Sequence, residues 1–174
     1  MASALELFPY VEDVVETYEI SEANYPFVLK VLENPKLNIK SAYRLDLLLK
    51  VGNYKYLIIG CHKDAVKDFE EAINLASSIY PDLKSNAKLA TAHENLSKVY
   101  VKTAYVQLAH KHLKMALEIK KHIYGWDHPE TALAVHCMGN VALAAAKPND
   151  AIEWHEKAIK LRKKLIGPDS YQVS

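Results

Sequence analysis

The side chains in this sequence that could do chemistry are eight histidines and two cysteines. His93 and His155 are each followed by glutamate, as in the His-Glu-x-x-His pattern of helical zinc sites. Neither pattern is completed, because Ser97 and Ile159 stand where the second histidine is needed. A zinc site needs three or four converging ligands, so the sequence predicts no metal site and no cofactor.

The cysteines and glycines give no sign of catalysis. Cys61 and Cys137 are 76 positions apart, and there is no Cys-x-x-Cys pair, which predicts free thiols in a reducing compartment. The five glycines form neither a phosphate-binding loop nor a dinucleotide fingerprint, and no nucleophile elbow is present. We therefore expect no catalytic residues and no enzyme activity.

The charge pattern argues against nucleic-acid binding, and the lengths of the uncharged stretches argue against a membrane span. The 22 basic residues are balanced by 21 acidic ones, whereas a general nucleic-acid binder would be markedly basic. The longest uncharged stretch, Thr131–Ala146, is shorter than a membrane span. The amino-terminal residues are acidic and lack the basic and apolar regions of a leader. We expect a cytoplasmic protein that binds no nucleic acid and has no membrane span.

The elements that position the polar residues come from an internal repeat of 42 residues, in which residues 86–127 align with residues 128–169. Small and apolar residues recur in register: Ala90 and Ala132, Val99 and Val141, Ala109 and Ala151, Ala116 and Ala158, Gly125 and Gly167. A period of this length is typical of stacked supersecondary units. We expect the repeated alanines where helices touch, since close helix packing requires a small side chain.

Each copy of the repeat is predicted to form two helices. Proline opens a helix at Pro129, and glycine ends one at Gly125 and another at Gly167, in agreement with the preferences of helix ends. The predicted helices lie near residues 86–102, 106–124, 128–146 and 149–166.

An earlier and more divergent copy occupies residues 38–82, with helices near 39–57 and 62–79, and residues 1–37 are expected to hold two N-terminal helices. Residues 170–174 begin a further repeat. We predict an all-α fold over residues 1–174, a single domain in the form of a right-handed α-solenoid of stacked antiparallel helix pairs.

These positions resemble the tetratricopeptide repeat, and the 42-residue spacing resembles the longer repeats of the kinesin light chain type. Leu96-Ser97 and Met138-Gly139 fall where such repeats carry Leu-Gly, and Tyr100 takes their aromatic position. Two residues depart from the pattern: His155 replaces an aromatic residue or leucine, and Ala142 replaces the aromatic residue seen at Tyr100. The resemblance implies a scaffold for peptides and proteins, in which the first helix of each pair lines a concave groove.

The resemblance places Asn95 where an asparagine often grips the backbone of a ligand. An amide side chain can donate and accept hydrogen bonds together, which suits a peptide unit. Lys98 and Lys102 follow at three and seven positions, so a helix brings them to the same side. With two residues of the next repeat, these form the predicted peptide-binding groove: Asn95, Lys98, Lys102, His136 and Asn140. Its positive bias suits a peptide that carries an acid or a carboxyl terminus.

The last helix carries an apolar stripe that includes Trp154, Leu161 and Leu165. In the preceding repeat the matching stripe is expected to be covered by the next first helix. We therefore predict a packing interface at this end, formed with a missing C-terminal part of the chain or, by self-association, with another copy.

Two functions remain open from the sequence. The first is a non-enzymatic adaptor that binds a peptide or a partner helix in the concave groove. The alternative is a structural assembly module that packs against other subunits or against a missing C-terminal part of its own chain.

Overall fold

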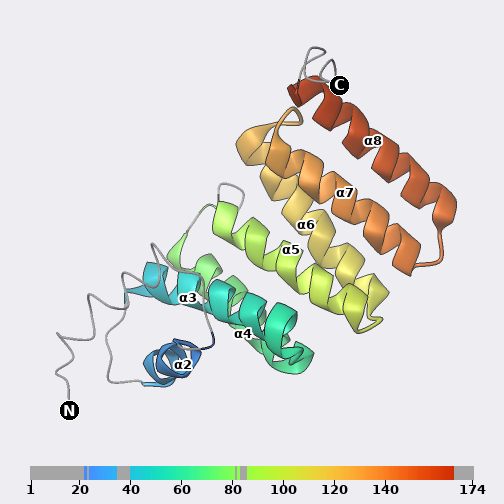
Figure 1. The fold of residues 1–174 in the computed structure, drawn as a ribbon. Coiled ribbons are helices and arrows are strands. Elements are labelled where there is room, and N and C mark those ends of the chain that lie inside the picture. The colour runs from blue at the N-terminus through green and yellow to red at the C-terminus, as the bar shows by residue number, and fades with distance from the viewer. Residues whose placement is uncertain (1–21, 23, 35–39, 81, 83–85, 167–174) are drawn as a thin grey trace, which may run out of the picture. The chain divides into compact units, whose positions relative to one another are not determined.

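The computed structural model describes residues 22, 24–34, 40–80, 82 and 86–166, and in these ranges the chain forms helices and turns without a strand. The elements are α2 (Tyr25–Glu33), α3 (Ser41–Tyr54), the π-helical turn η1 (Lys55–Ile59), α4 (His62–Ile79), α5 (Ala87–Lys102), α6 (Val106–Tyr124), α7 (Pro129–Ala144) and α8 (Pro148–Ile166) (Figure 1). The all-α prediction is confirmed. The helix expected before residue 20 and the further repeat expected from residue 170 lie outside the described residues.

The chain divides into two compact units, Met1–Pro81 and Asp82–Ser174. In the first unit, α3 packs against both α2 and α4. In the second unit, α5 packs against α6, α6 against α7, and α7 against α8 (Figure 1). Each unit is therefore built from successive helices that pack against their neighbours in sequence, as the repeat predicts. That the two units make one domain stays a prediction.

Local sequence explains where the helices of the second unit begin and end. The Asn86 side chain accepts hydrogen bonds from the backbone N–H groups of Lys88 and Leu89, at 3.0 and 3.2 Å, and so caps α5. The ring Nδ1 of His128 accepts one from the N–H of Glu130 at 3.1 Å at the start of α7. Gly125 ends α6 with a φ of 77°, a conformation that glycine adopts without strain.

The repeated small residues lie where helices approach closely. The four alanines of the second helices are each at most 1% exposed: Ala109, Ala116, Ala151 and Ala158. Gly139 on α7 lies against the ring of His155, so closely that an added Cβ would be 2.5 Å from it. Gly52 on α3 lies in the same way against Phe69, where the distance would be 2.7 Å. In these two helix pairs, α3–α4 and α7–α8, a large side chain therefore lies against a glycine.

The π-helical turn explains why the first unit fits the repeat less well. Gly52 and Phe69 are 17 positions apart, whereas Gly139 and His155 are 16 apart. The additional residue is accommodated where α3 continues into η1, because a π-turn is wider than an α-turn. Leu57 and Ile58 on this turn are each 69% exposed.

Two alanines adopt a strained conformation at equivalent turns of the second unit. Ala104 and Ala146 follow α5 and α7 with φ angles of 64° and 57°. The chain is held there by a hydrogen bond from the N–H of Tyr105 to the carbonyl of Tyr100, and by one from Lys147 to Ala142, both 2.9 Å. Glycine is the usual residue at this position of a helix end, because a Cβ is crowded in the left-handed region.

We predict that Ala104→Gly and Ala146→Gly each raise the free energy of unfolding by about 0.5–1 kcal/mol. Relief of the left-handed strain, about 1–2 kcal/mol, outweighs the entropy cost of glycine, about 0.5–1 kcal/mol. Urea unfolding monitored by circular dichroism measures the change. Ala144→Gly, on the last residue of α7, is the matched control and should destabilise. A loss of stability in Ala146→Gly would show that its turn is not held in the left-handed conformation.

Candidate functional site

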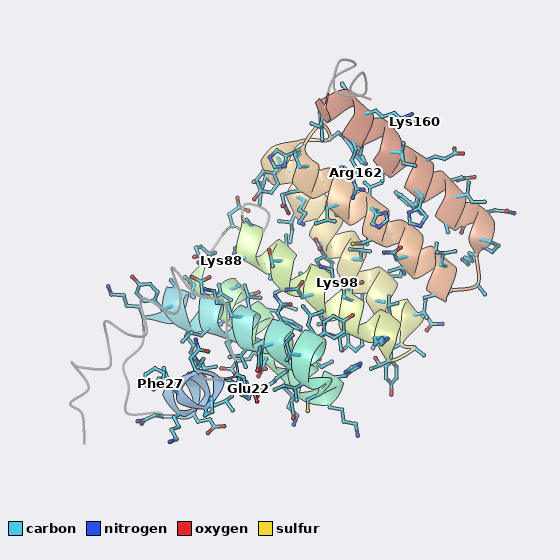
Figure 2. The ribbon with its side chains drawn as sticks, in the orientation of Figure 1. Glu22, Phe27, Lys88, Lys98, Lys160 and Arg162 are labelled. Carbon is cyan, nitrogen blue, oxygen red and sulfur yellow. The ribbon has the colours of Figure 1, made fainter. Side chains whose placement is uncertain are left out.

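The predicted groove residues of the second unit lie on α5 and α7. We call their surface the α5–α7 face, and it comprises Glu94, Asn95, Lys98, Lys102, His136, Cys137 and Asn140. The two helices approach each other here, since the charges of Glu94 and Lys98 on α5 influence the pKa of the Cys137 thiol on α7. Lys98 is labelled in Figure 2. Ten of the sixteen residues of α5 are buried, polar ones among them, so the face has a substantial buried polar layer.

A network of charged side chains joins three helices beneath this face. Glu94 on α5 and Lys120 on α6 are 4% and 3% exposed and form an ion pair. The Lys120 Nζ also lies 2.8 Å from the Glu130 Oε2 at the start of α7. The second oxygen of Glu94 pairs with Lys98 at 2.8 Å. The buried lysine is therefore compensated by one carboxylate from each neighbouring helix.

The pKa shifts in this network follow from its ion pairs. Burial by itself would raise the pKa of Glu94, but Lys120 and Lys98 outweigh it and hold that pKa below its ordinary value. Burial would lower the pKa of Lys120, but Glu94 and Glu130 outweigh it and raise that pKa. Both groups are thus charged at neutral pH. Burial raises the pKa of the Cys137 thiol, so this free cysteine is held neutral.

Asn95 lies beside this network and is only 6% exposed. Its Oδ1 is 3.4 Å from the Nζ of Lys98, a long contact. Its buried Nδ2 has no hydrogen-bond partner in the described part of the chain. Since a buried donor without a partner costs about 1–3 kcal/mol, this amide favours any ligand that brings an acceptor to it.

The other predicted groove residues are more accessible. Lys98 and His136 are partly buried, and Lys102 and Asn140 are exposed. The structure brings Lys98 against Asn95 and Glu94, whereas His136 lies against His155 of α8. Their common role in binding stays a prediction.

In each of the two repeats of the second unit, one pair of histidine rings connects the two helices. The Nδ1 atoms of His93 and His112 are 2.9 Å apart, and Tyr100 stacks on His112 with ring centroids 5.6 Å apart. The Nδ1 atoms of His136 and His155 are 3.2 Å apart. Burial and the neighbouring His112 lower the pKa of His93 to about 4. Burial, His155 and Arg162 lower the pKa of His136.

We predict that the second unit loses stability as the pH falls from 6.5 toward 4. A lowered pKa means that the unfolded chain takes up a proton at His93 before the folded chain does, so acid favours unfolding. The stabilisation is complete above pH 6.5. Lowering the pH from 7.5 to 5.5 should reduce the free energy of unfolding by about 1 kcal/mol through the titration of His93. Urea unfolding at both pH values measures it.

His93→Gln should reduce this dependence on pH, because the glutamine does not titrate. His110→Gln is the control, since His110 is exposed on α6. An equal acid-induced loss in the wild type and in His93→Gln would assign the effect to other groups.

The apolar stripe predicted on the last helix, α8, is only partly exposed to solvent. Trp154 and Leu161 are partly buried, and Leu165 is 37% exposed. A shift of 42 residues places Ile159 at the position of Leu117 on α6; Ile159 is 51% exposed, whereas Leu117 is 5% exposed. This difference arises because α7 covers α6, while no helix in the described ranges covers α8 on that side.

The most buried charged residues, Glu94 and Lys120, could not be identified from the sequence. An acid on the first helix and a base 26 positions later on the second gave no local signal, because helical spacing reveals only pairs within one helix. The same holds for Glu130 on the first turn of α7. Its lysine partner lies ten positions away, across a turn.

Among the described residues, no three histidine, cysteine, aspartate or glutamate side chains are grouped as metal ligands would be. None of the helices in the described ranges has the length and apolar character needed to cross a membrane.

Residues 88–164 match the family model described as tetratricopeptide repeat. The chain is 28% identical over 129 residues to the clustered mitochondria protein homolog of Candida albicans (strain SC5314), and this match covers 74% of the chain and 9% of that protein. Residues 90–96 and 165–171 also resemble amyloid protein-binding protein 2, a likeness that these comparisons do not test.

Among solved structures, the chain is similar in fold to BtubC (BKLC) from P. vanneervenii, with a TM-score of 0.69 and 18% identity. The match covers 98% of this chain and 63% of that one. The chain therefore spans less than a tenth of the curated relative and less than two thirds of the solved one.

Proposed function

We infer that the chain is a non-enzymatic adaptor, because residues 88–164 match the tetratricopeptide repeat, whose copies generally mediate protein–protein interactions. Its ligand is a peptide or a partner helix, bound on the α5–α7 face. The observation that carries this proposal is the buried and unpartnered Nδ2 of Asn95.

The chemistry of the face favours a ligand with a backbone carbonyl and a nearby acid. A peptide carbonyl would supply the acceptor that the Asn95 amide lacks. Lys98 already shares Glu94 with Lys120, and Lys102 is exposed on the last turn of α5. A carboxylate on the ligand would gain from both lysines, because Glu94 is more fully engaged by the buried Lys120. An acidic side chain or a carboxyl terminus fits this arrangement.

We predict that Asn95→Ala weakens peptide binding roughly 5- to 150-fold, the equivalent of about 1–3 kcal/mol for one lost hydrogen bond in a buried site. A peptide-display library selected on the immobilised wild-type chain supplies the ligand, and isothermal titration measures its affinity. Asn149→Ala, on an exposed asparagine of α8, is the matched control. Lys98→Glu should weaken binding and reduce its dependence on salt.

Wild-type affinity in both Asn95→Ala and Lys98→Glu would place the binding site elsewhere. Circular dichroism of each variant separates a loss of binding from a loss of folding. Selection of peptides without any common motif would count against the adaptor and in favour of the alternative function.

The alternative, a structural assembly module, is supported by the exposed apolar residues of α8. Ile159 and Leu165 stand where α6 has Leu117 and the partly buried Ile123. Arg162 stands at the position of Lys120, which α7 pairs with Glu130. This end of the second unit could take a further helix or a second copy of the chain in the same register.

For this alternative we predict self-association of the wild-type chain at high concentration, which Ile159→Glu abolishes because it places a charge in the apolar contact. Sedimentation velocity measures the change. Ile152→Glu is the matched control: Ile152 is 57% exposed, but its equivalent on α6 is the exposed His110, which α7 does not cover. Equal association in Ile159→Glu and the wild type would exclude this surface.

A further inference from the structure

The π-helical turn η1 carries the most exposed large apolar side chains in the described part of the chain. Leu57 and Ile58 are each 69% exposed, and the next residue, Ile59, is 42% exposed. Single apolar residues are ordinary on a protein surface, whereas a run of three exposed ones is unusual unless it has a function. We call these three residues the η1 tip. They belong to the first unit and lie outside the α5–α7 face.

The backbone next to the η1 tip is closed by hydrogen bonds, so the tip is a formed turn. The N–H of Cys61 donates to the carbonyl of Lys55, and the N–H of His62 to that of Gly60, both at 3.0 Å. Gly60 has a φ of 76°, and an added Cβ there would meet no atom within 4 Å, so the end of the turn is open. A turn with paired backbone groups can enter an apolar environment without leaving them unsatisfied.

The equivalent turns of the second unit carry no such run. α5 and α7 are followed by the left-handed Ala104 and Ala146, and the next residues are Tyr105 and Lys147. In the first unit the π-turn instead continues α3 into three aliphatic side chains. Since π-turns are frequent at functional sites, the run is a feature of this helix pair and not of the repeat.

The η1 tip is a projection and not a groove. It lies where the chain turns from α3 into α4, at the end of this helix pair (Figure 1). Successive residues of a helical turn are about 100° apart, so three of them face different directions, and all three are exposed. A protein surface would cover one side of such a turn and leave the others in water. A fluid bilayer would surround every side, so the shape favours a membrane over a protein partner.

The charges of this helix pair are divided between its two ends. Residues 50–67, which include the tip, contain four lysines and one acid. Residues 68–79, which form the rest of α4, contain three acids and no base. The end with the tip is therefore net positive, and an anionic surface would attract that end and repel the other.

Two of these lysines have acidic partners. The Nζ of Lys55 lies 2.8 Å from Asp68, and both side chains are largely buried. The Nζ of Lys67 lies 2.9 Å from Asp64, and this pair is exposed, so each charge is also accessible to the solvent. Lys63, on the first turn of α4, is exposed as well. The accessible positive charge next to the tip thus comes mainly from Lys63 and Lys67.

Two tyrosines precede the tip on the same helix. Tyr56 is partly buried and meets the ring of His62 edge-on, with centroids 5.7 Å apart. Tyr54 packs against Tyr25 of α2, with centroids 4.8 Å apart. Tyrosine is enriched at the boundary between water and membrane, where its ring lies in the apolar region and its hydroxyl in the polar one.

We propose that the η1 tip is a membrane-docking surface, which inserts its three aliphatic side chains into the headgroup region of a bilayer that contains anionic phospholipid. Lys63 and Lys67 contact the headgroups, and Tyr56 lies at their level. Such docking is peripheral and needs no membrane-spanning helix. It is independent of peptide binding on the α5–α7 face.

The test uses the full chain and two kinds of vesicle. The first contains phosphatidylcholine with about one third phosphatidylserine, and the second contains phosphatidylcholine alone. Cosedimentation measures the bound fraction against lipid concentration. We expect binding to the anionic vesicles to be roughly tenfold tighter, and to weaken as salt is added. Binding to neither kind of vesicle, or equal binding to both, would overturn the proposal.

Ile58→Asp should weaken binding to the anionic vesicles roughly tenfold or more, because it places a charge in the inserted part of the tip. Ile152→Asp is the matched control, since Ile152 on α8 is 57% exposed and lies in the second unit. Circular dichroism verifies that both variants are folded. Wild-type binding in Ile58→Asp, or an equal loss in Ile152→Asp, would contradict the tip as the docking surface.

Two further variants separate the parts of the proposal. Lys63→Glu should weaken binding to the anionic vesicles several-fold and reduce its dependence on salt. Asn95→Ala should bind the vesicles as the wild type does, whatever its effect on peptides. Loss of vesicle binding in Asn95→Ala with wild-type binding in Lys63→Glu would assign the membrane contact to the α5–α7 face instead.

A dye locates the contact directly. Cys61 is exposed and Cys137 is buried, so an environment-sensitive maleimide dye labels Cys61, directly after Gly60. Its emission should shift to the blue with anionic vesicles. The same dye on Asn149→Cys, in a Cys61→Ser background, should not shift, since Asn149 is an exposed residue of α8. A shift at Cys61 that needs no vesicles and grows with protein concentration would assign the tip to self-association and overturn the proposal.

Discussion

The arrangement of the second unit depends on a buried lysine. Lys120 is 3% exposed, and its charge is compensated by Glu94 of α5 and Glu130 of α7. Loss of Glu94 would leave a buried cation without its buried partner, a change that typically costs about 3–5 kcal/mol. An apolar trio could be as stable, so we infer that the ions specify register rather than add stability. A shift of α7 by one residue along α6 would separate Glu130 from Lys120. The ion pairs therefore fix which residues of α5 and α7 come together above them, Asn95 among them.

The helices themselves could be predicted because their signals are local. The bounds of α4 and α6 agree with the predicted ranges 62–79 and 106–124, and the recurrence of Ala109 and Ala116 identified the contact positions. The burial of polar residues on α5 could not be predicted in this way. Glu94 and Asn95 look like surface residues in sequence, and only the assembly of α5, α6 and α7 brings Lys120 to Glu94. The additional residue at η1 was also missed, because a π-turn has the same residue types as the α-helix that it interrupts.

A hollow between the N-terminal ends of α6 and α8 shows a different limit of sequence reasoning. Ala142 was visible as a departure from the repeat, in place of an aromatic residue, but a departure does not reveal whether a neighbour fills the space. The structure answers this, because Lys147 and Trp154 line an open volume instead of closing it. In the preceding pair the same positions hold Tyr105 and His112, which close around Tyr100. The hollow is open to solvent, since Ala146, Lys147 and Asp150 on its wall are exposed, so water can fill the space that a ring fills in the preceding pair.

The two candidate sites would select ligands by different physics. At Asn95 a buried donor lacks an acceptor, so a ligand is favoured for one hydrogen bond, and the backbone that supplies it is common to all peptides. At the η1 tip three aliphatic side chains are exposed beside a net positive charge, so an anionic bilayer is favoured for apolar area and for charge, neither of which requires a fixed geometry. A hydrogen bond is directional, whereas the hydrophobic effect is not. The tip would therefore determine where the chain lies, and the α5–α7 face would determine what it binds there. A peptide tied to the same membrane would then gain affinity for that face, and the gain would depend on the length of chain between the peptide and the membrane.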